Sequence, residues 1–337
     1  MKSDFAHSEK LGRRIRAGSP ASLGVSTYDL IGEALHAGDR VKAGDYLSYA
    51  IEEASRIFFV FTTWIDAMLR YGEAEVEDFA DRLAALERTL GAPPPLVEEP
   101  ADVGRAEAAV AAVAVRRGDA RAVEDALAAL REAQLTVHDL QADWCWALLT
   151  SFRDALGEER VEEVLRVTQA PWLAERYARY ADMTAEESLQ LTVEGMRGHL
   201  TGPGRKGTVD VRDEDDRWVL SFDPCGSGGR MRRGDPERGQ VPRTEPPYEF
   251  GVTEDAHPWS WGQKGVCLYC AHCAVVNEIL AIEATGAPMR VVDYPTDPGA
   301  PCHWTIYKSP DLVPDEAYKR VGKQPPQRRS TSEPEPR

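Results

Sequence analysis

Basic residues are scarce in this chain. Its 337 residues include 40 lysines and arginines against 56 aspartates and glutamates, so the formal net charge is −16 at pH 7. A surface of this sign repels the phosphate backbone of a nucleic acid, which argues against DNA or RNA as a partner. The chain also lacks the P-loop and dinucleotide-binding fingerprints, so no motif in it points to a nucleotide cofactor.

Long apolar segments are missing as well. The longest apolar run, at about 57–69, contains Asp66 and is too short to span a bilayer. The first residues are charged and carry no apolar segment of the kind found in signal peptides. We therefore expect a cytoplasmic protein without a membrane-spanning segment, in a compartment where thiols stay reduced.

The region 26–200 shows helical patterns without strand-like alternation, which predicts an all-α helical bundle. Two capping-box patterns, Ser26–Asp29 and Thr184–Glu187, mark helix starts. Residues 1–25 lack periodicity and are expected to form a flexible arm. We expect helices at about 27–36, 45–71, 75–90, 102–117, 119–133, 134–156, 158–168, 171–181 and 185–199.

One polar group inside the bundle has two interpretations. His138, Asp139 and Asp143 share a predicted helix, and the two aspartates are one turn apart on one face. They could line a pocket within the bundle or form an ordinary solvated helix face. The solvated face is the expectation.

The pattern changes after residue 204. Alternating segments and one helical segment predict a small antiparallel sheet of ββαββ topology, which makes the whole chain α+β. We expect this domain at 205–311, followed by a disordered tail at 312–337. The expected elements are strands at 208–212, 217–222, 289–293 and 303–308, and a helix at 272–284.

Five of the six cysteines lie in this C-terminal part. Cys267, Cys270 and Cys273 have two successive C-x-x-C spacings, whereas Cys225 and Cys302 stand alone. In the predicted topology Cys225 follows the second strand, Cys270 and Cys273 begin the helix, and Cys302 precedes the last strand. These segments should therefore meet at one edge of the sheet.

Clustered cysteines in a reducing compartment are typical of metal or catalytic sites, and zinc commonly takes four cysteines or three cysteines and a histidine. The predicted ligands of a zinc ion are Cys225, Cys270, Cys273 and Cys302. The substitutes for any of them are Cys267, His272 and His303.

The site has three possible chemical roles. Four closed ligands would make the zinc structural, whereas an open position would let it activate water for hydrolysis. Without metal, Cys273 or Cys270 at the helix start could act as a thiolate nucleophile. The candidate bases for that nucleophile are His272, His303 and His257.

A glycine-rich segment follows Cys225. Gly226, Ser227, Gly228, Gly229 and Arg230 could form an anion-binding nest, or the glycines could make a tight turn that lets Cys225 reach the metal. The tight turn is the expectation. Residues 224–228 resemble part of the SEC-C zinc motif, although Asp223 stands where that motif has a cysteine.

The leading functional hypothesis is therefore a zinc- or thiolate-dependent enzyme, hydrolase-like, acting on a small polar or anionic substrate. The alternative is a non-catalytic interaction protein in which zinc is structural and the helical bundle binds a partner. The sequence specifies no oligomeric state.

Overall fold

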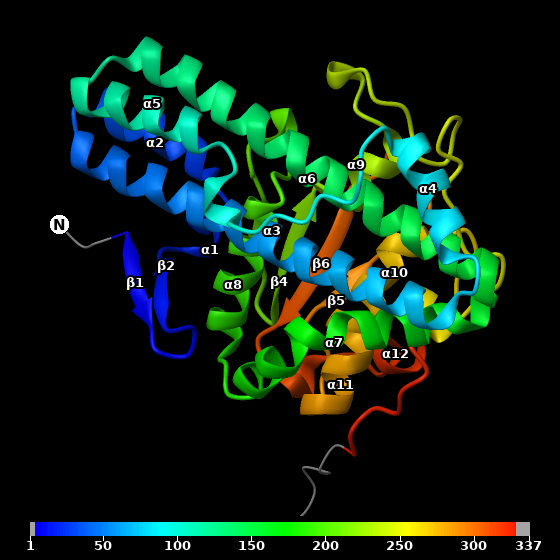
Figure 1. Ribbon diagram of the computed structural model, residues 1–337. Coiled ribbons are helices and arrows are strands. Elements are labelled where there is room, and N and C mark those ends of the chain that lie inside the picture. The colour runs from blue at the N-terminus through cyan, green and yellow to red at the C-terminus, as the bar shows by residue number, and fades with distance from the viewer. Residues whose placement is uncertain (1–3, 328–337) are drawn as a thin grey trace, which may run out of the picture.

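The computed structural model describes residues 4–327, except for the side chains of residues 174 and 175. Helices build the N-terminal part, and two long ones, α3 and α6, run across the molecule (Figure 1). Their bounds are α1 Pro20–Leu23, α2 Thr27–His36, α3 Arg40–Glu75, α4 Phe79–Leu90, α5 Arg105–Arg117, α6 Ala120–Leu156, α7 Val161–Tyr180 and α8 Ala185–Gly198.

Caps fix where the main helices begin. The side chains of Asp39 and Asp119 accept hydrogen bonds from backbone N–H groups in the first turns of α3 and α6, and Thr184 forms the predicted capping box of α8. The break predicted near residue 133 is absent, because that segment has neither glycine nor proline to interrupt it. Helix α7 likewise continues through Pro171, where two helices were expected.

The first residues differ from the predicted flexible arm. Strands β1 (Phe5–Ser8) and β2 (Arg13–Arg16) form an antiparallel hairpin. Arg13 pairs with the buried carboxylate of Glu194 on α8, and Arg16, only 3% exposed, donates to carbonyl groups around α1. Ile15 of β2 is buried as well and Phe5 of β1 packs against Tyr49, but strands of four residues offer too little hydrophobic alternation to reveal the hairpin.

The C-terminal part contains the predicted antiparallel sheet, with strand order β3-β4-β6-β5. The fold is thus mixed α and β, as predicted. The strands are β3 Asp210–Asp213, β4 Arg217–Phe222, β5 Val291–Asp293 and β6 Cys302–Tyr307. The helices are α9 Gly228–Arg233, α10 Leu268–Ala274, its continuation through a π-helical turn Val275–Ile279 into α11 Leu280–Thr285, and α12 Asp315–Lys319.

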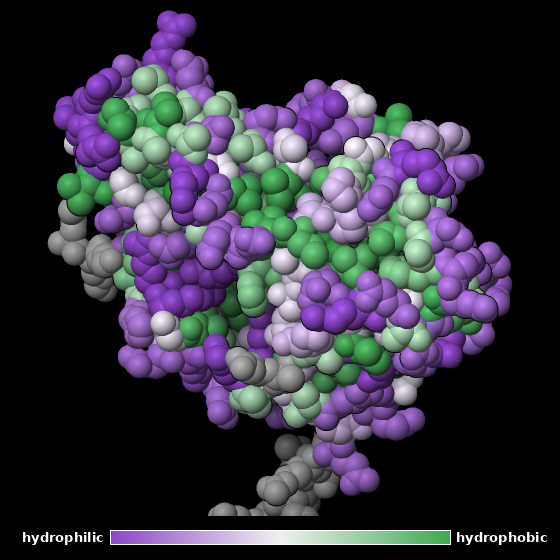
Figure 2. Space-filling view, viewed as in Figure 1, coloured by the Kyte–Doolittle hydropathy of each residue, from purple (hydrophilic) through white to green (hydrophobic). Residues whose placement is uncertain are grey.

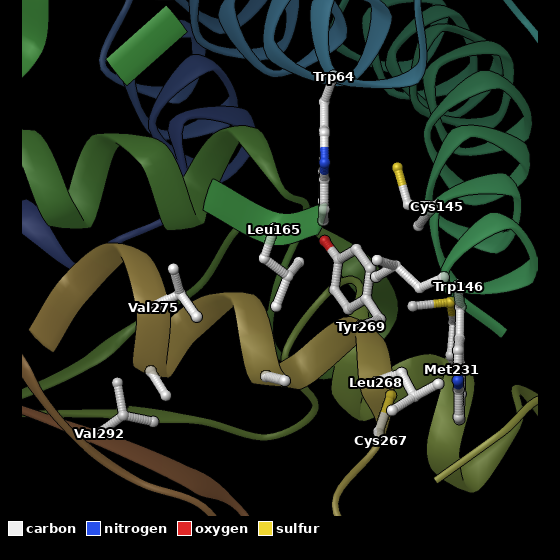
Figure 3. Packing of buried hydrophobic residues seen from close by; sticks show 14 of the residues in the cluster. Trp64, Cys145, Trp146, Leu165, Met231, Cys267, Leu268, Tyr269, Val275 and Val292 are labelled. Carbon is white, nitrogen blue, oxygen red and sulfur yellow. The ribbon is translucent and has the colours of Figure 1, made fainter. Parts of the chain in front are cut away.

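One hydrophobic core joins the bundle to the sheet. It includes Trp64 of α3 and Trp146 of α6 together with Leu268 and Tyr269 of α10. Figure 3 shows Tyr269 pointing from α10 toward Trp64, and the two ring centroids are 5.8 Å apart. The predicted domain boundary near residue 200 therefore does not separate two cores.

The predicted disordered tail needs a correction for its first part. Helix α12 buries Tyr318, which is 1% exposed, in a small cluster with Val313 and Ala317. This cluster packs against Ile282, so the segment is ordered by apolar contacts although its sequence is rich in proline and charge. The rest of the predicted tail, 328–337, lies outside the described residues.

Polar residues cover much of the molecular surface, with an apolar band across the face in Figure 2. Among residues 4–327, no helix combines the length and the apolar character that crossing a membrane requires.

Candidate functional site

The four predicted zinc ligands line one pocket. Cys225, Cys270, Cys273 and Cys302 all contribute to the wall of one open hollow. We call it the thiol pocket. Three segments far apart in the sequence thus meet there, as the predicted topology required.

The sheet register explains this meeting. Cys302 opens β6 and is directly paired with Phe222, the last residue of β4, and Cys225 follows three residues later. Helix α10 then brings Cys270 and Cys273 to the same place. The glycine at 228 is needed for this approach, because a Cβ atom there would lie 2.5 Å from the Cys270 Sγ.

The thiols influence one another electrostatically. Burial raises the pKa of Cys273 well above its ordinary range, and the neighbouring Cys270, Cys302 and Cys225 raise it further. The pKa of Cys302 is raised in the same way, again first by burial and then by Cys225 and Cys270. In the absence of a cation Cys273 and Cys302 are therefore neutral thiols, and a bound cation would be needed to hold these two as thiolates.

The residues fit zinc in donor type but not in their present arrangement. Four sulfur donors on one pocket match the ligand set that zinc prefers. Yet within residues 4–327 no group of three or more His, Cys, Asp or Glu side chains is arranged so that it could hold a metal ion. The cysteine sulfur atoms would have to rearrange around a common point for a metal to bind.

Cys267 lies behind the pocket. It is 1% exposed, does not line the thiol pocket, and shares a side-chain hydrogen bond with Cys270. This hydrogen bond lowers the pKa of Cys270, whereas burial raises that of Cys267. The first C-x-x-C pair therefore has one partner in the core and one at the pocket.

The three candidate histidines lie in different places. His272 lines the thiol pocket, its Nε2 lies 3.6 Å from the Cys273 Sγ, and burial lowers its pKa to about 4. His303 lies between Cys302 and Trp304, and since both of these line the pocket, strand alternation directs His303 to the other face of the sheet. His257 also lies outside the pocket and contacts Glu158 at 2.8 Å. Of the three, the structure brings only His272 to the cysteines.

The glycine-rich segment lies partly at the thiol pocket and partly in the protein core. Ser227, Gly228 and Gly229 line the thiol pocket, and Gly226 passes so close to α8 that a Cβ atom would lie 1.7 Å from the carbonyl oxygen of residue 199. Arg230 points away into the core, where it is 1% exposed and donates to Asp143 at 2.8 Å. This arrangement favours the tight-turn interpretation, because the guanidinium of Arg230 is engaged within the protein.

Sequence reasoning missed His199 at the end of α8. It lines the thiol pocket and shares a 3.0 Å hydrogen bond with His138, which in turn contacts Asp139 at 3.0 Å. His138 and Asp139 are buried, as is Asp143, so the expectation of a solvated helix face is wrong. The pairing of a histidine with an adjacent aspartate was the available signal. The arginines beside these carboxylates come from distant segments: Arg205 pairs with Asp139, whereas Arg230 and Arg243 pair with Asp143.

In comparisons with known proteins, no family model, curated protein or solved structure matches this chain. What the fold and the site define is an α+β protein in which a helical bundle and a small sheet enclose a pocket lined with thiols.

Proposed function

We propose that this chain is a zinc-binding protein in which Cys225, Cys270, Cys273 and Cys302 hold the ion. The observation that carries the proposal is that all four thiols line one pocket although they come from three distant segments. Free thiols need no such grouping, whereas zinc requires it. When bound, zinc would polarise a substrate or activate water if one coordination position stays open.

A second feature supports a small polar or anionic substrate. The thiol pocket shares His199, His272, Met196, Tyr269 and Trp304 with a larger neighbouring cavity, so a molecule in that cavity would reach the thiols. His272 and His199 stand at the junction, and burial lowers the pKa of both. Both are therefore neutral imidazoles, which can exchange hydrogen bonds with a polar substrate of a hydrolase-like reaction.

Metal analysis of serine variants tests the ligand set. Cys225→Ser and Cys302→Ser should each lose bound zinc as severely as Cys270→Ser, because each removes one of four donors. Cys267→Ala is the matched control and should retain zinc, since Cys267 does not line the pocket. Full zinc content in Cys225→Ser or Cys302→Ser would sink the proposed set.

Cobalt substitution then separates the two forms of the proposal. Four thiolates around the cobalt would mean a closed site that holds the fold together, with the bundle left as a binding module for a partner. A nitrogen or oxygen donor in one position, exchanging with solvent, would mean an open site suited to catalysis.

A metal-free alternative is favoured by one contact. The Cys273 thiol lies 3.6 Å from His272 Nε2, a nucleophile–base distance that would shorten on reaction. If the purified chain holds no metal, His272→Gln should slow the alkylation of Cys273 by iodoacetamide. Equal rates in wild type and variant would leave His272 without a role as base.

A further inference from the structure

We propose that the larger cavity beside the thiol pocket binds a small aromatic carboxylate, with Arg176 and Arg290 holding the carboxylate group. This binding site would supply the substrate class of the proposed function. The inference rests on the proposed function only for the reaction itself, because binding in the cavity needs no metal. We call this hollow the arginine cavity. It lies between α3, α7, α8 and the π-helical turn, and its lining includes residues of all four.

Two cations of the cavity have no carboxylate partner in the described part of the chain. Arg290 is half-buried and bonds to neutral groups, with its Nε 2.7 Å from Thr192 Oγ1 and its Nη1 2.9 Å from Asn277 Oδ1. The guanidinium of Arg176 lies 4.6 Å from the ring centroid of Trp172. Among the described side chains no carboxylate lies within 4 Å of either guanidinium, although the chain has far more acids than bases.

The other arginines of the same cavity show the contrast. Arg13 and Arg56 both pair with Glu194, at 2.5 Å and 3.3 Å. Both of these arginines therefore already have a carboxylate partner within the protein. On the other side, Arg176 and Arg290 are close enough to repel each other, since Arg176 adds to the lowering of the Arg290 pKa that burial begins. An anion between them would remove this repulsion.

A buried amide provides an independent observation. Gln169 of α7 is fully buried and lines the cavity, yet among residues 4–327 neither its side-chain oxygen nor its nitrogen has a hydrogen-bond partner. Buried polar groups in folded proteins are almost always paired, so an orphan amide in a cavity wall points to a ligand. Gln169, Trp172 and Arg176 follow one another at helical spacing and therefore share one face of α7.

The rest of the wall indicates what the ligand's body is like. Trp64, Trp172 and Trp304 line the cavity, and the Trp304 ring also lies 5.4 Å from the Arg290 guanidinium. Flat indole surfaces favour a flat apolar body, and a planar guanidinium favours a carboxylate that it can bind through two parallel hydrogen bonds. An aromatic carboxylate satisfies both requirements.

The test compares acids with their own amides. Isothermal titration calorimetry with benzoate, 1-naphthoate and indole-3-acetate, each against its primary amide, should show at least one acid binding about tenfold or more tighter than its amide. Arg290→Met and Arg176→Met should each abolish that preference. Arg82→Met is the control, because it removes the same charge from a surface pair with Asp78. If no acid binds better than its amide, the proposal is overturned.

Gln169→Met guards against a folding artefact. Because the Gln169 side chain has no hydrogen-bond partner within residues 4–327, the variant should keep or raise the melting temperature. It should also weaken the binding of the preferred acid. A lower melting temperature with unchanged binding would contradict the role given to Gln169. Repeating the titration on Cys270→Ser separates the two proposals. If this variant lacks metal but still prefers the acid to its amide, the carboxylate proposal stands. If the wild type holds metal and the variant no longer prefers the acid, the carboxylate proposal is overturned, because binding in the cavity should not need the metal.

Discussion

At the scale of single residues, Asp143 is a buried carboxylate held between two arginines. Its two carboxylate oxygens each accept a hydrogen bond of 2.8 Å, one from Arg230 and one from Arg243. All three side chains are at most 7% exposed. Charges at such depth are tolerated only while they are matched, so Asp143 ties α6 to α9 and to the loop after it.

Replacing this carboxylate should therefore cost much stability. Asp143→Asn leaves the buried guanidinium of Arg243 without its counter-ion and takes from Arg230 the nearer of two carboxylates, the other being Asp139 at 3.7 Å. We expect the free energy of unfolding to fall by about 3–5 kcal/mol. Urea denaturation measures the change.

The matched control is Asp66→Asn, which removes an exposed partner of Arg70 on α3. That change should cost less than about 1 kcal/mol. Similar losses in the two variants would show that the Asp143 pairs carry no special stabilisation.

At the scale of elements, Glu283 connects α11 to α7. Its carboxylate receives two hydrogen bonds from Arg166, at 2.8 and 2.9 Å, and a third from Lys323 beyond α12. These contacts, the hydrogen bond from Arg166 foremost, lower the pKa of Glu283 from 4.5 to about 2. The carboxylate thus stays charged in the folded protein at pH values where it would be protonated in the unfolded chain.

This difference makes the contact depend on pH. Because the folded pKa lies below the unfolded one, the stabilisation is complete above pH 4.5 and is lost as the pH falls toward 2. The side chain is 38% exposed, so solvent screening limits the effect to less than about 1 kcal/mol.

Wild type should therefore exceed Glu283→Gln in unfolding free energy at pH 7, and the gap should close between pH 4.5 and pH 2 and shrink in 1 M salt. Urea titrations at pH 7, 4 and 3 measure this gap. A gap that widens on acidification would refute the assigned role.

At the scale of the whole molecule, the helical bundle and the sheet share their core. Trp64 and Trp146 belong to the bundle, and they pack in one cluster with Leu268 and Tyr269 of the sheet part. Neither part can expose this surface without loss, so we expect one cooperative unfolding transition.

Far-UV circular dichroism, which reports mainly on the helices, and tryptophan fluorescence should give coincident melting curves. Two separated transitions would mean that residues 26–200 and 205–311 unfold independently, as the predicted domain boundary implied.

Much of this architecture was predictable from the sequence. The strands expected at 217–222 and 303–308 correspond to β4 and β6. The helix expected at 272–284 is found, although it begins four residues earlier, at Leu268. Together these placed Cys225, Cys270, Cys273 and Cys302 at one sheet edge, because antiparallel topology fixes which strand ends meet.

Features set by tertiary packing were not predictable in this way. His199 has no motif around it and reaches the pocket only because Gly226 lets the chain pass close to α8. Gln169 and Arg290 look like ordinary surface residues until α7 and the π-helical turn are packed together. The orientation of His303 followed from a strand register that a shift by one residue would have reversed.

The central claim is that four cysteines on one pocket bind a zinc ion, and its most direct test is native mass spectrometry with elemental analysis of protein purified without chelator. We predict one zinc per chain that is released on denaturation. Chains without metal, with the thiols of Cys225, Cys270, Cys273 and Cys302 all open to alkylation, would contradict the account.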